Sequence, residues 1–284
     1  MRLATIALSL AALFTPLRAS AQSALTPWRE HVREQIDSER AGLGLDLNTF
    51  FGKAQGAGNT FFQPTVTAGA RYREGVLEAA LPFAYAHENH DPGDDGDRVA
   101  LGNPWLALAY LPACECGLSR LSLGIAIDAA SSRTALVRRV NALARGATGD
   151  WDGYLWIDRM LPLVLGASTR ADIAKHVRLN WDGDVIFGLP AGTREFEIGT
   201  QHAVELAYVP TWHWQVSLRA SAVWYPTFEG DRFQSSLGSV LRYVFVKDAI
   251  GARFVMNLDP PHGFAFTKDG MWGLGFFYQR SLGT

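Results

Sequence analysis

The chain has 284 residues, of which 48% are hydrophobic and 12% aromatic, and its formal net charge is -2. Only four of its 26 basic residues are lysines, and no basic block of the kind that follows a phosphate backbone is present, so nucleic-acid binding is disfavoured. After the first 21 residues, no segment offers about 18 uninterrupted apolar residues, which excludes helical membrane spans.

The first 21 residues have the three parts of a secretory signal peptide. Arg2 gives a basic start, residues 3–14 are apolar, and Ala19, Ser20 and Ala21 form a small-residue cleavage pattern. We therefore predict an exported protein that is cut after residue 21. Removal of residues 1–21 takes away two arginines and changes the formal net charge from -2 to about -4.

Residues 22–40 are predicted to form a periplasmic leader before the main fold. Thr26 can cap a short helix that has Pro27 at its first position. This leader would either close the periplasmic mouth of the fold as a small plug or rest beside it.

From residue 41 onward, apolar residues alternate with small or polar residues. In residues 196–210, for example, Leu206 and Tyr208 share one side of an extended chain while Glu197 and Glu205 share the other. A period of two residues is the signal of a β-strand. Twelve strands are predicted, and an even number is typical of bacterial outer-membrane barrels. They cover residues 42–52, 62–72, 76–86, 104–112, 120–130, 161–173, 175–189, 194–210, 212–228, 232–247, 249–260 and 270–282.

The connections between these segments alternate in length. The connections after the even-numbered strands are short, whereas the others include "GKAQGAGN", "HENHDPGDDGD" and a helical insertion at about residues 132–160. Short periplasmic turns and long external loops alternate in this way in membrane barrels. The predicted fold is therefore all-β, a closed antiparallel transmembrane β-barrel over residues 41–284 with an external helical insertion.

Aromatic residues offer a geometric test of a membrane-spanning strand. Trp214 and Trp224 lie on one face, ten residues apart, which is about 33 Å along a strand. A tilt of about 45° reduces this to roughly 23 Å, close to the apolar band of about 25 Å between two aromatic girdles. We assign Trp214, Trp224 and Trp272 to such girdles.

Charged residues of both signs recur on the faces opposite the apolar residues. If the apolar faces meet lipid, these side chains line a hydrated lumen in which they can pair. The predicted lumen-lining residues are Asp46, Arg71, Glu78, Asp128, Arg178, Asp182, Glu197, Glu205, Arg219, Arg242 and Arg253.

Two other clusters are weaker candidates for chemistry. His87, His90 and Asp91 lie in an acidic loop that is interpreted either as a solvated external loop or as a divalent-cation site, although it lacks EF-hand spacing. Cys114 and Cys116 are interpreted as a local disulfide, since a metal site would need more ligands than their turn supplies. We predict no cofactor.

"LGNPWLALAYLP" (101–112), "LSLGIAID" (121–128) and the closing "WGLGFFYQRSL" (272–282) carry a family resemblance. In these segments the chain resembles bacterial outer-membrane barrels, and more narrowly the transporters of aromatic-degradation (meta) pathways and FadL-type channels. The resemblance implies a place in the bacterial outer membrane and a hydrophobic or aromatic solute. It also implies contact with outer-membrane lipid and with the outer-membrane insertion machinery.

The function favoured by these patterns is passive passage of small solutes, without covalent chemistry. One alternative is an outer-membrane enzyme such as a phospholipase-like barrel, which would need an outward-facing histidine and serine near the external lipid boundary. Another is a structural or adhesive barrel that acts through its external loops. A soluble periplasmic β-protein is a more distant alternative.

Overall fold

The computed structural model shows one antiparallel sheet of thirteen strands, and the structure describes residues 41–54, 59–88, 96–112, 118–130, 135–148, 151–191, 195–227, 233–245, 248–259 and 270–281. The predicted signal peptide and the predicted leader lie outside these residues. The strands are β1 (Ala41–Ala54), β2 (Asn59–Tyr72), β3 (Gly75–Glu88), β4 (Gly96–Leu101), β5 (Trp105–Tyr110), β6 (Leu118–Ala126), β7 (Met160–Ala174), β8 (Val177–Pro190), β9 (Glu197–Tyr208), β10 (Trp214–Trp224), β11 (Phe233–Val244), β12 (Asp248–Asn257) and β13 (Met271–Ser281).

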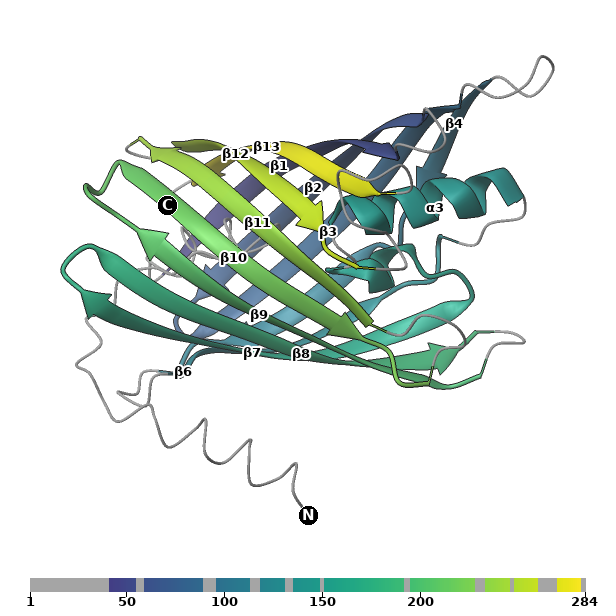
Figure 1. Ribbon diagram of the computed structural model, residues 1–284. Helices are drawn as coiled ribbons and strands as arrows, with labels where there is room; N and C mark the ends of the chain where they lie inside the picture. Colours follow the sequence, from purple (N-terminus) through teal and green to yellow (C-terminus); the bar gives the residue numbers. More distant parts are fainter. Residues whose placement is uncertain are drawn as a thin grey trace.

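The sheet curls so that its first and last strands lie side by side (Figure 1). From β5 to β13, each strand pairs with the next one along the chain, and β1 pairs with β2. β1 also pairs with β13, from Gly44 opposite Ser281 to Ala54 opposite Met271, and β2 pairs with β3. The predicted all-β antiparallel sheet is confirmed.

The fourth predicted strand, residues 104–112, corresponds to β5, and the structure adds a strand before it, β4, which was not predicted. β3 pairs with β5 at Ala80 opposite Trp105 and with β4 at Phe83 opposite Leu101, so the partner has one extra residue there. This bulge faces Pro82, whose carbonyl oxygen accepts a hydrogen bond from the Gly102 N–H (2.9 Å). A proline lacks the N–H that a regular ladder needs, so an interruption opposite it is expected. The thirteen strands thus occupy twelve positions around the sheet.

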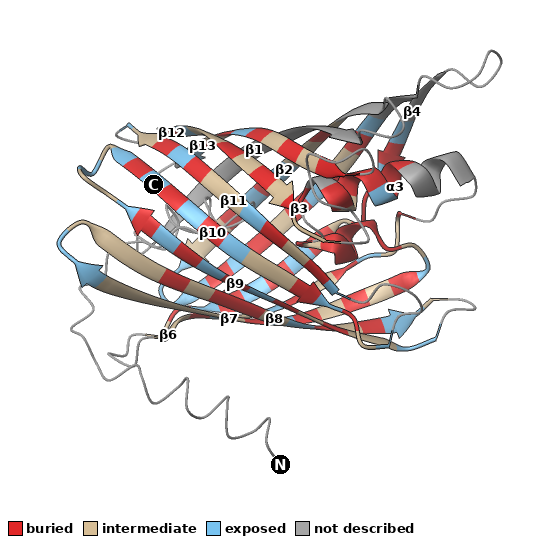
Figure 2. Ribbon diagram, viewed as in Figure 1, coloured by how far each residue is buried: buried red, intermediate tan, exposed pale blue. Residues whose placement is uncertain are grey.

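Exposed and buried residues alternate along the strands, as Figure 2 shows by colour. In β5, Leu106 and Leu108 are exposed on one face while Ala107 and Ala109 are buried on the other. In β10, Leu218 is 65% exposed and its neighbour Arg219 is buried. The large apolar side chains therefore cover the outside of the curled sheet, and the polar and small ones lie inside it.

The short and long connections gather at opposite ends of the sheet. Residues 73–74 join β2 to β3 and residues 175–176 join β7 to β8 at the short-turn end. At the other end, the loop end, the helix α3 (Ala135–Ala147) and the 3-10 helix η1 (Gly153–Trp156) lie between β6 and β7. Of the helices in the described part of the chain, none is both long and apolar enough to span a membrane.

The helical insertion turns its apolar side chains toward the inside of the sheet. Val140 and Leu143 of α3 and Tyr154 of η1 belong to one buried cluster with inward-facing residues of the strands. Six of those strand residues are alanines, and their small side chains leave room for the insertion: Ala80, Ala84, Ala100, Ala107, Ala126 and Ala203. The apolar core therefore sits inside the loop end of the sheet (Figure 2).

Candidate functional site: the inside of the sheet

Most of the charged residues predicted to line the lumen are buried. Six of them are only 1–7% exposed: Glu78, Asp182, Glu205, Arg219, Arg242 and Arg253. Arg71, Asp128, Arg178 and Glu197 are partly exposed. The side chain of Asp46 lies outside the described residues, while its backbone pairs with Thr67 and Gln279.

The first buried ion pair joins β3 to β6, which are separated in the sheet by β5. Arg120 of β6 donates a hydrogen bond from Nη2 to Oε1 of Glu78 on β3 (2.5 Å), and both side chains are at most 5% exposed. Arg120 is not among the residues predicted to line the interior. Its spacing of eight residues from Asp128 puts the two on the same face of an extended chain, and this signal could have found it.

The second charged group centres on Arg219 of β10. Its Nη1 lies 2.9 Å from Oδ2 of Asp182 on β8 and 3.9 Å from Oε2 of Glu205 on β9. The strand register brings these groups together, because Arg219 stands opposite Glu205 and Glu205 stands opposite Asn180. Asn180 in turn stands opposite Arg170 of β7, so a polar row crosses four strands.

A third group lies on β11, β12 and β13. Arg242 donates from Nη2 to Oε1 of Gln279 (3.2 Å). The guanidinium of Arg253 lies over the ring of Phe277, 5.0 Å from its centroid. Phe277 has room for this position because Gly251 has no side chain, and a Cβ there would lie 2.1 Å from the ring.

The partly exposed residues lie nearer the two ends. Arg178 donates to Oδ1 of Asp172 (3.0 Å) beside the short β7–β8 turn. Arg71 donates to the backbone oxygen of Arg73 (2.7 Å) in the β2–β3 turn. At the loop end, Oδ1 of Asp128 accepts a hydrogen bond from the N–H of Arg159 (3.1 Å). The interior thus has two zones. The buried charged residues, among them Glu78, Arg219 and Arg242, form the charged zone toward the short-turn end, and the buried cluster with Val140 and Tyr154 forms the apolar zone toward the loop end.

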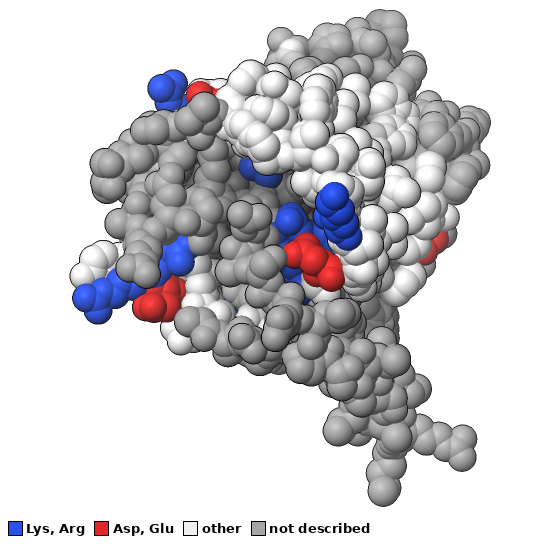
Figure 3. All heavy atoms as spheres, turned by 90° about the vertical axis from the view of Figure 1, so that its left-hand side faces the viewer, with Lys and Arg blue, Asp and Glu red and all other residues white. Residues whose placement is uncertain are grey.

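Figure 3 looks onto the short-turn end, where the molecule is hollowed and basic and acidic side chains stand together in and beside the hollow. The alternation in the sequence predicted inward charges that pair and remain hydrated. Those of the charged zone are instead largely buried, because they pair with one another and pack against neighbours such as Phe277. A buried charge is tolerated only when it is paired and hydrogen-bonded.

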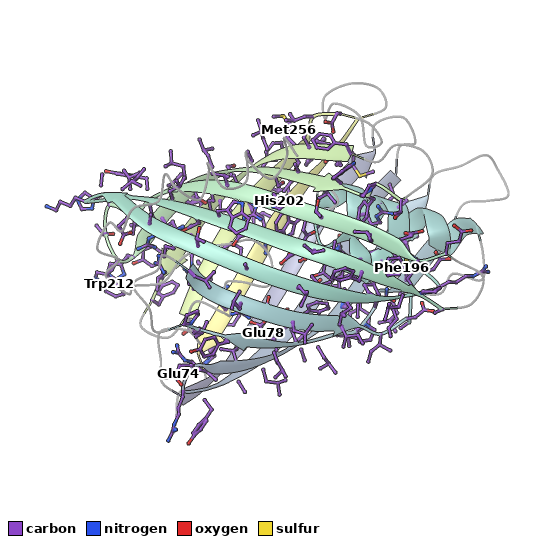
Figure 4. All side chains as sticks on the ribbon, turned by 90° about the horizontal axis from the view of Figure 1, so that it is seen from below. Glu74, Glu78, Phe196, His202, Trp212 and Met256 are labelled. Carbon is purple, nitrogen blue, oxygen red and sulfur yellow. The ribbon has the colours of Figure 1, made fainter. Side chains whose placement is uncertain are left out.

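Aromatic side chains stand at both ends of the outer surface. Trp214 and Trp224 are 46% and 51% exposed, and Trp272 is partly exposed with its ring 6.1 Å from that of Phe254. Trp214 contacts Tyr243 at a ring distance of 4.6 Å near the short-turn end. Figure 4 shows Glu74 and Trp212 at that end and Phe196 toward the other.

Among the described residues, Ser221 and His213 bond to other groups rather than to each other, so they do not form the serine–histidine pair of a hydrolase. Ser221 shares a hydrogen bond with Ser236 (2.7 Å), and Nδ1 of His213 lies 2.9 Å from the backbone oxygen of Val244. On the outer surface, the exposed His202 stacks on Trp181 at a ring distance of 6.0 Å.

The two remaining predicted clusters are not among the side chains that the structure describes. The side chains of His87, His90 and Asp91 and the turn with Cys114 and Cys116 lie outside the described residues. Among the described residues, no group of three or more histidine, cysteine, aspartate or glutamate side chains could hold a metal ion.

The architecture can be compared with solved structures. An outer-membrane channel from Pseudomonas putida F1 aligns with a TM-score of 0.57 and 13% identity over 94% of this chain and 100% of its own. The sheet shares the fold of outer-membrane barrels. The NanC porin aligns with a TM-score of 0.54 and 7% identity over 84% of this chain and 100% of its own. The β domain of the Bordetella autotransporter BrkA gives 0.51 and 11% over 86% and 100%. No protein-family model and no curated protein matches the chain.

Proposed function

We propose that the chain forms a closed barrel in the bacterial outer membrane and lets small solutes diffuse through its interior. The observation that carries this proposal is the division of charge between the two faces of one curled sheet. Paired charges such as Arg219 with Asp182 lie inside, and large apolar residues such as Leu218 lie outside.

Closure is supported by the strand pairings. Each of the twelve positions has a neighbour on both sides, because β1 pairs with β13 and β2 pairs with β3. A closed sheet leaves no row of unpaired backbone groups, which is the condition for crossing a bilayer with strands.

The outer surface supports a lipid environment. Large apolar residues are exposed on strands all around the sheet, and soluble proteins rarely expose apolar patches larger than a few hundred Å². In a bilayer the same residues meet hydrocarbon. They include Leu77, Leu106, Leu123, Leu165, Val204, Leu218, Leu241, Ile250 and Phe276.

The interior supports a route for small solutes rather than a wide pore. The charged side chains of the charged zone are only 1–7% exposed inside the sheet, so they would act as a filter of size and charge. The resemblance to FadL-type channels suggests hydrophobic or aromatic compounds as the solute class. Lumen-lining roles for Glu205 and Arg219 form part of this proposal.

Planar-bilayer recording tests the proposal through single current steps and their ion selectivity. The chain should give discrete steps, Arg219→Ala should shift selectivity toward cations, and Glu205→Ala should shift it toward anions. The reason is that each change removes one fixed interior charge. An absence of current steps and of solute uptake by vesicles, in all three proteins, would remove the transport function.

A further inference from the structure

The helical insertion is fastened inside the loop end of the sheet from several sides. We use the name insertion plug for residues 135–148 and 151–159. Four buried side-chain amides of the surrounding sheet reach its atoms, each only 0–5% exposed: Gln63, Asn103, Gln201 and Asn257. They come from β2, from the break between β4 and β5, from β9 and from β12.

Asn103 makes the densest set of these contacts. Its Nδ2 donates to the backbone oxygens of Tyr154 (3.1 Å) and Ile157 (2.8 Å). Its Oδ1 accepts from the N–H groups of Ala129 (2.9 Å) and Ala130 (2.7 Å), just before the insertion plug. One side chain therefore fixes both the entry and the exit of the insertion.

The other three amides hold the plug at separate points. Asn257 donates to the backbone oxygen of Gly146 (2.8 Å), and Gln201 accepts from the N–H of Asp152 (3.1 Å). Gln63, in the amide orientation that satisfies its neighbours, donates to the oxygen of Ala144 (3.1 Å) and accepts from the indole of Trp156 (3.2 Å).

Two cation–π contacts add to this attachment. The guanidinium of Arg219 lies 4.3 Å from the ring centroid of Trp151 in the plug, and that of Arg145 in α3 lies 5.9 Å from the ring centroid of Tyr225 in the wall. Arg219 is the same residue that pairs with Asp182. The charged zone and the plug are thus in direct contact.

We propose that the insertion plug is a gate, docked in the resting state so that it closes the loop end of the interior, and that solutes pass only when it undocks. This proposal rests on the proposed channel function and adds its regulation. We expect undocking to break the amide contacts together, because Gln63 contacts both α3, at Ala144, and η1, at Trp156, and so ties the two parts of the plug to one wall residue. The gate should therefore switch between a dominant closed state and a rare open one.

The test measures the fraction of time that single channels are open in planar bilayers. Gln201→Leu combined with Asn257→Leu removes two wall amides with little change of side-chain volume. Trp151→Ala removes the plug residue that contacts Arg219 of the wall. The matched control is Gln215→Leu, a buried amide at the short-turn end of β10. Heat-modifiable gel mobility establishes that each protein has folded.

Loss of two hydrogen bonds that hold the docked plug predicts an increase in open fraction of roughly tenfold or more. We expect this increase in the double variant and in Trp151→Ala, with an unchanged open fraction in the Gln215→Leu control. Equal open fractions in the natural chain, the double wall variant and Trp151→Ala would overturn the gate and leave the channel function standing. Absence of current steps in every protein would overturn both.

Discussion

The guanidinium of Arg219 lies 4.3 Å above the ring of Trp151, so the charged zone of the interior touches the insertion that fills its loop end. Arg219 also lies 2.9 Å from a carboxylate oxygen of Asp182 and 3.9 Å from one of Glu205. Its position therefore depends on two strands of the wall and on the plug at once. In the proposed channel, Arg219 connects the charged zone that would set selectivity to the plug that would close the interior.

Replacing Arg219 with methionine should destabilise the fold. Asp182 and Glu205 would remain buried after losing this arginine, and removal of one partner of a buried pair costs about 3–5 kcal/mol. Urea unfolding in lipid vesicles, followed by tryptophan fluorescence, measures the change in free energy of unfolding. Arg219→Lys keeps the charge and should lose less; an equal loss in both variants would show that the charge is unimportant.

Replacing Asn103 with leucine should loosen the insertion more than any other single amide change. It would leave two N–H groups and two carbonyls of the backbone without their present partner, each costing about 1–3 kcal/mol if it stays buried and unsatisfied. The comparison is Asn141→Leu, because Nδ2 of Asn141 donates to a single oxygen, that of Ala130 (3.1 Å). Thermal unfolding midpoints in detergent give the order, and a lower midpoint for Asn141→Leu would contradict it.

An arginine placed on the outer surface should lower the free energy of unfolding by an amount that depends on its depth in the bilayer. Leu218 lies between Trp214 and Trp224 on β10, so Leu218→Arg should destabilise the barrel by about 2–4 kcal/mol. Trp212 lies in the short β9–β10 connection, where Trp212→Arg should cost only about 0–1 kcal/mol. Reversible folding into lipid vesicles measures the change in the free energy of unfolding for both variants. Similar losses at the two sites would argue against a membrane-spanning β10.

Adding one methyl group at Gly124 should disturb the apolar zone. A Cβ there would lie 2.0 Å from the ring of Trp105, which packs against Tyr154 at a ring distance of 5.2 Å. Gly124→Ala should therefore displace Trp105 and weaken its near-ultraviolet circular dichroism. At Gly75 the nearest atom is 3.5 Å away, so Gly75→Ala should leave the spectrum unchanged. An unchanged spectrum in both variants would mean that Trp105 is free to move.

Strand positions could be predicted from the sequence because alternation of apolar and polar residues is a local property. The same alternation placed Glu205 and Arg219 on one face, and the structure brings their side chains together. It did not predict β4, since this six-residue strand directly follows the acidic loop and is separated from β5 by a bulge opposite Pro82 of the neighbouring strand.

The docking of the insertion could not be predicted in the same way. Residues such as Gln201 and Asn257 are ordinary inward-facing positions by their spacing, and their partners are backbone atoms 49 and 111 residues away in the chain. A weak signal was available in the inward-facing alanines, among them Ala107 and Ala126, because small residues on the inner face of a narrow barrel leave space that another segment must fill.

Collision accessibility of spin labels tests the two-faced sheet most directly. Single cysteines at Leu218, Leu206, Ser217 and Ala207 would be labelled in vesicles, with Cys114 and Cys116 replaced by serine. Labels at Leu218 and Leu206 should be open to oxygen and shielded from a water-soluble nickel complex, as expected for side chains in hydrocarbon, while those at Ser217 and Ala207 should show low oxygen accessibility. Lipid exposure at Ser217 and Ala207, with Leu218 and Leu206 shielded from oxygen, would contradict the assignment of inside and outside.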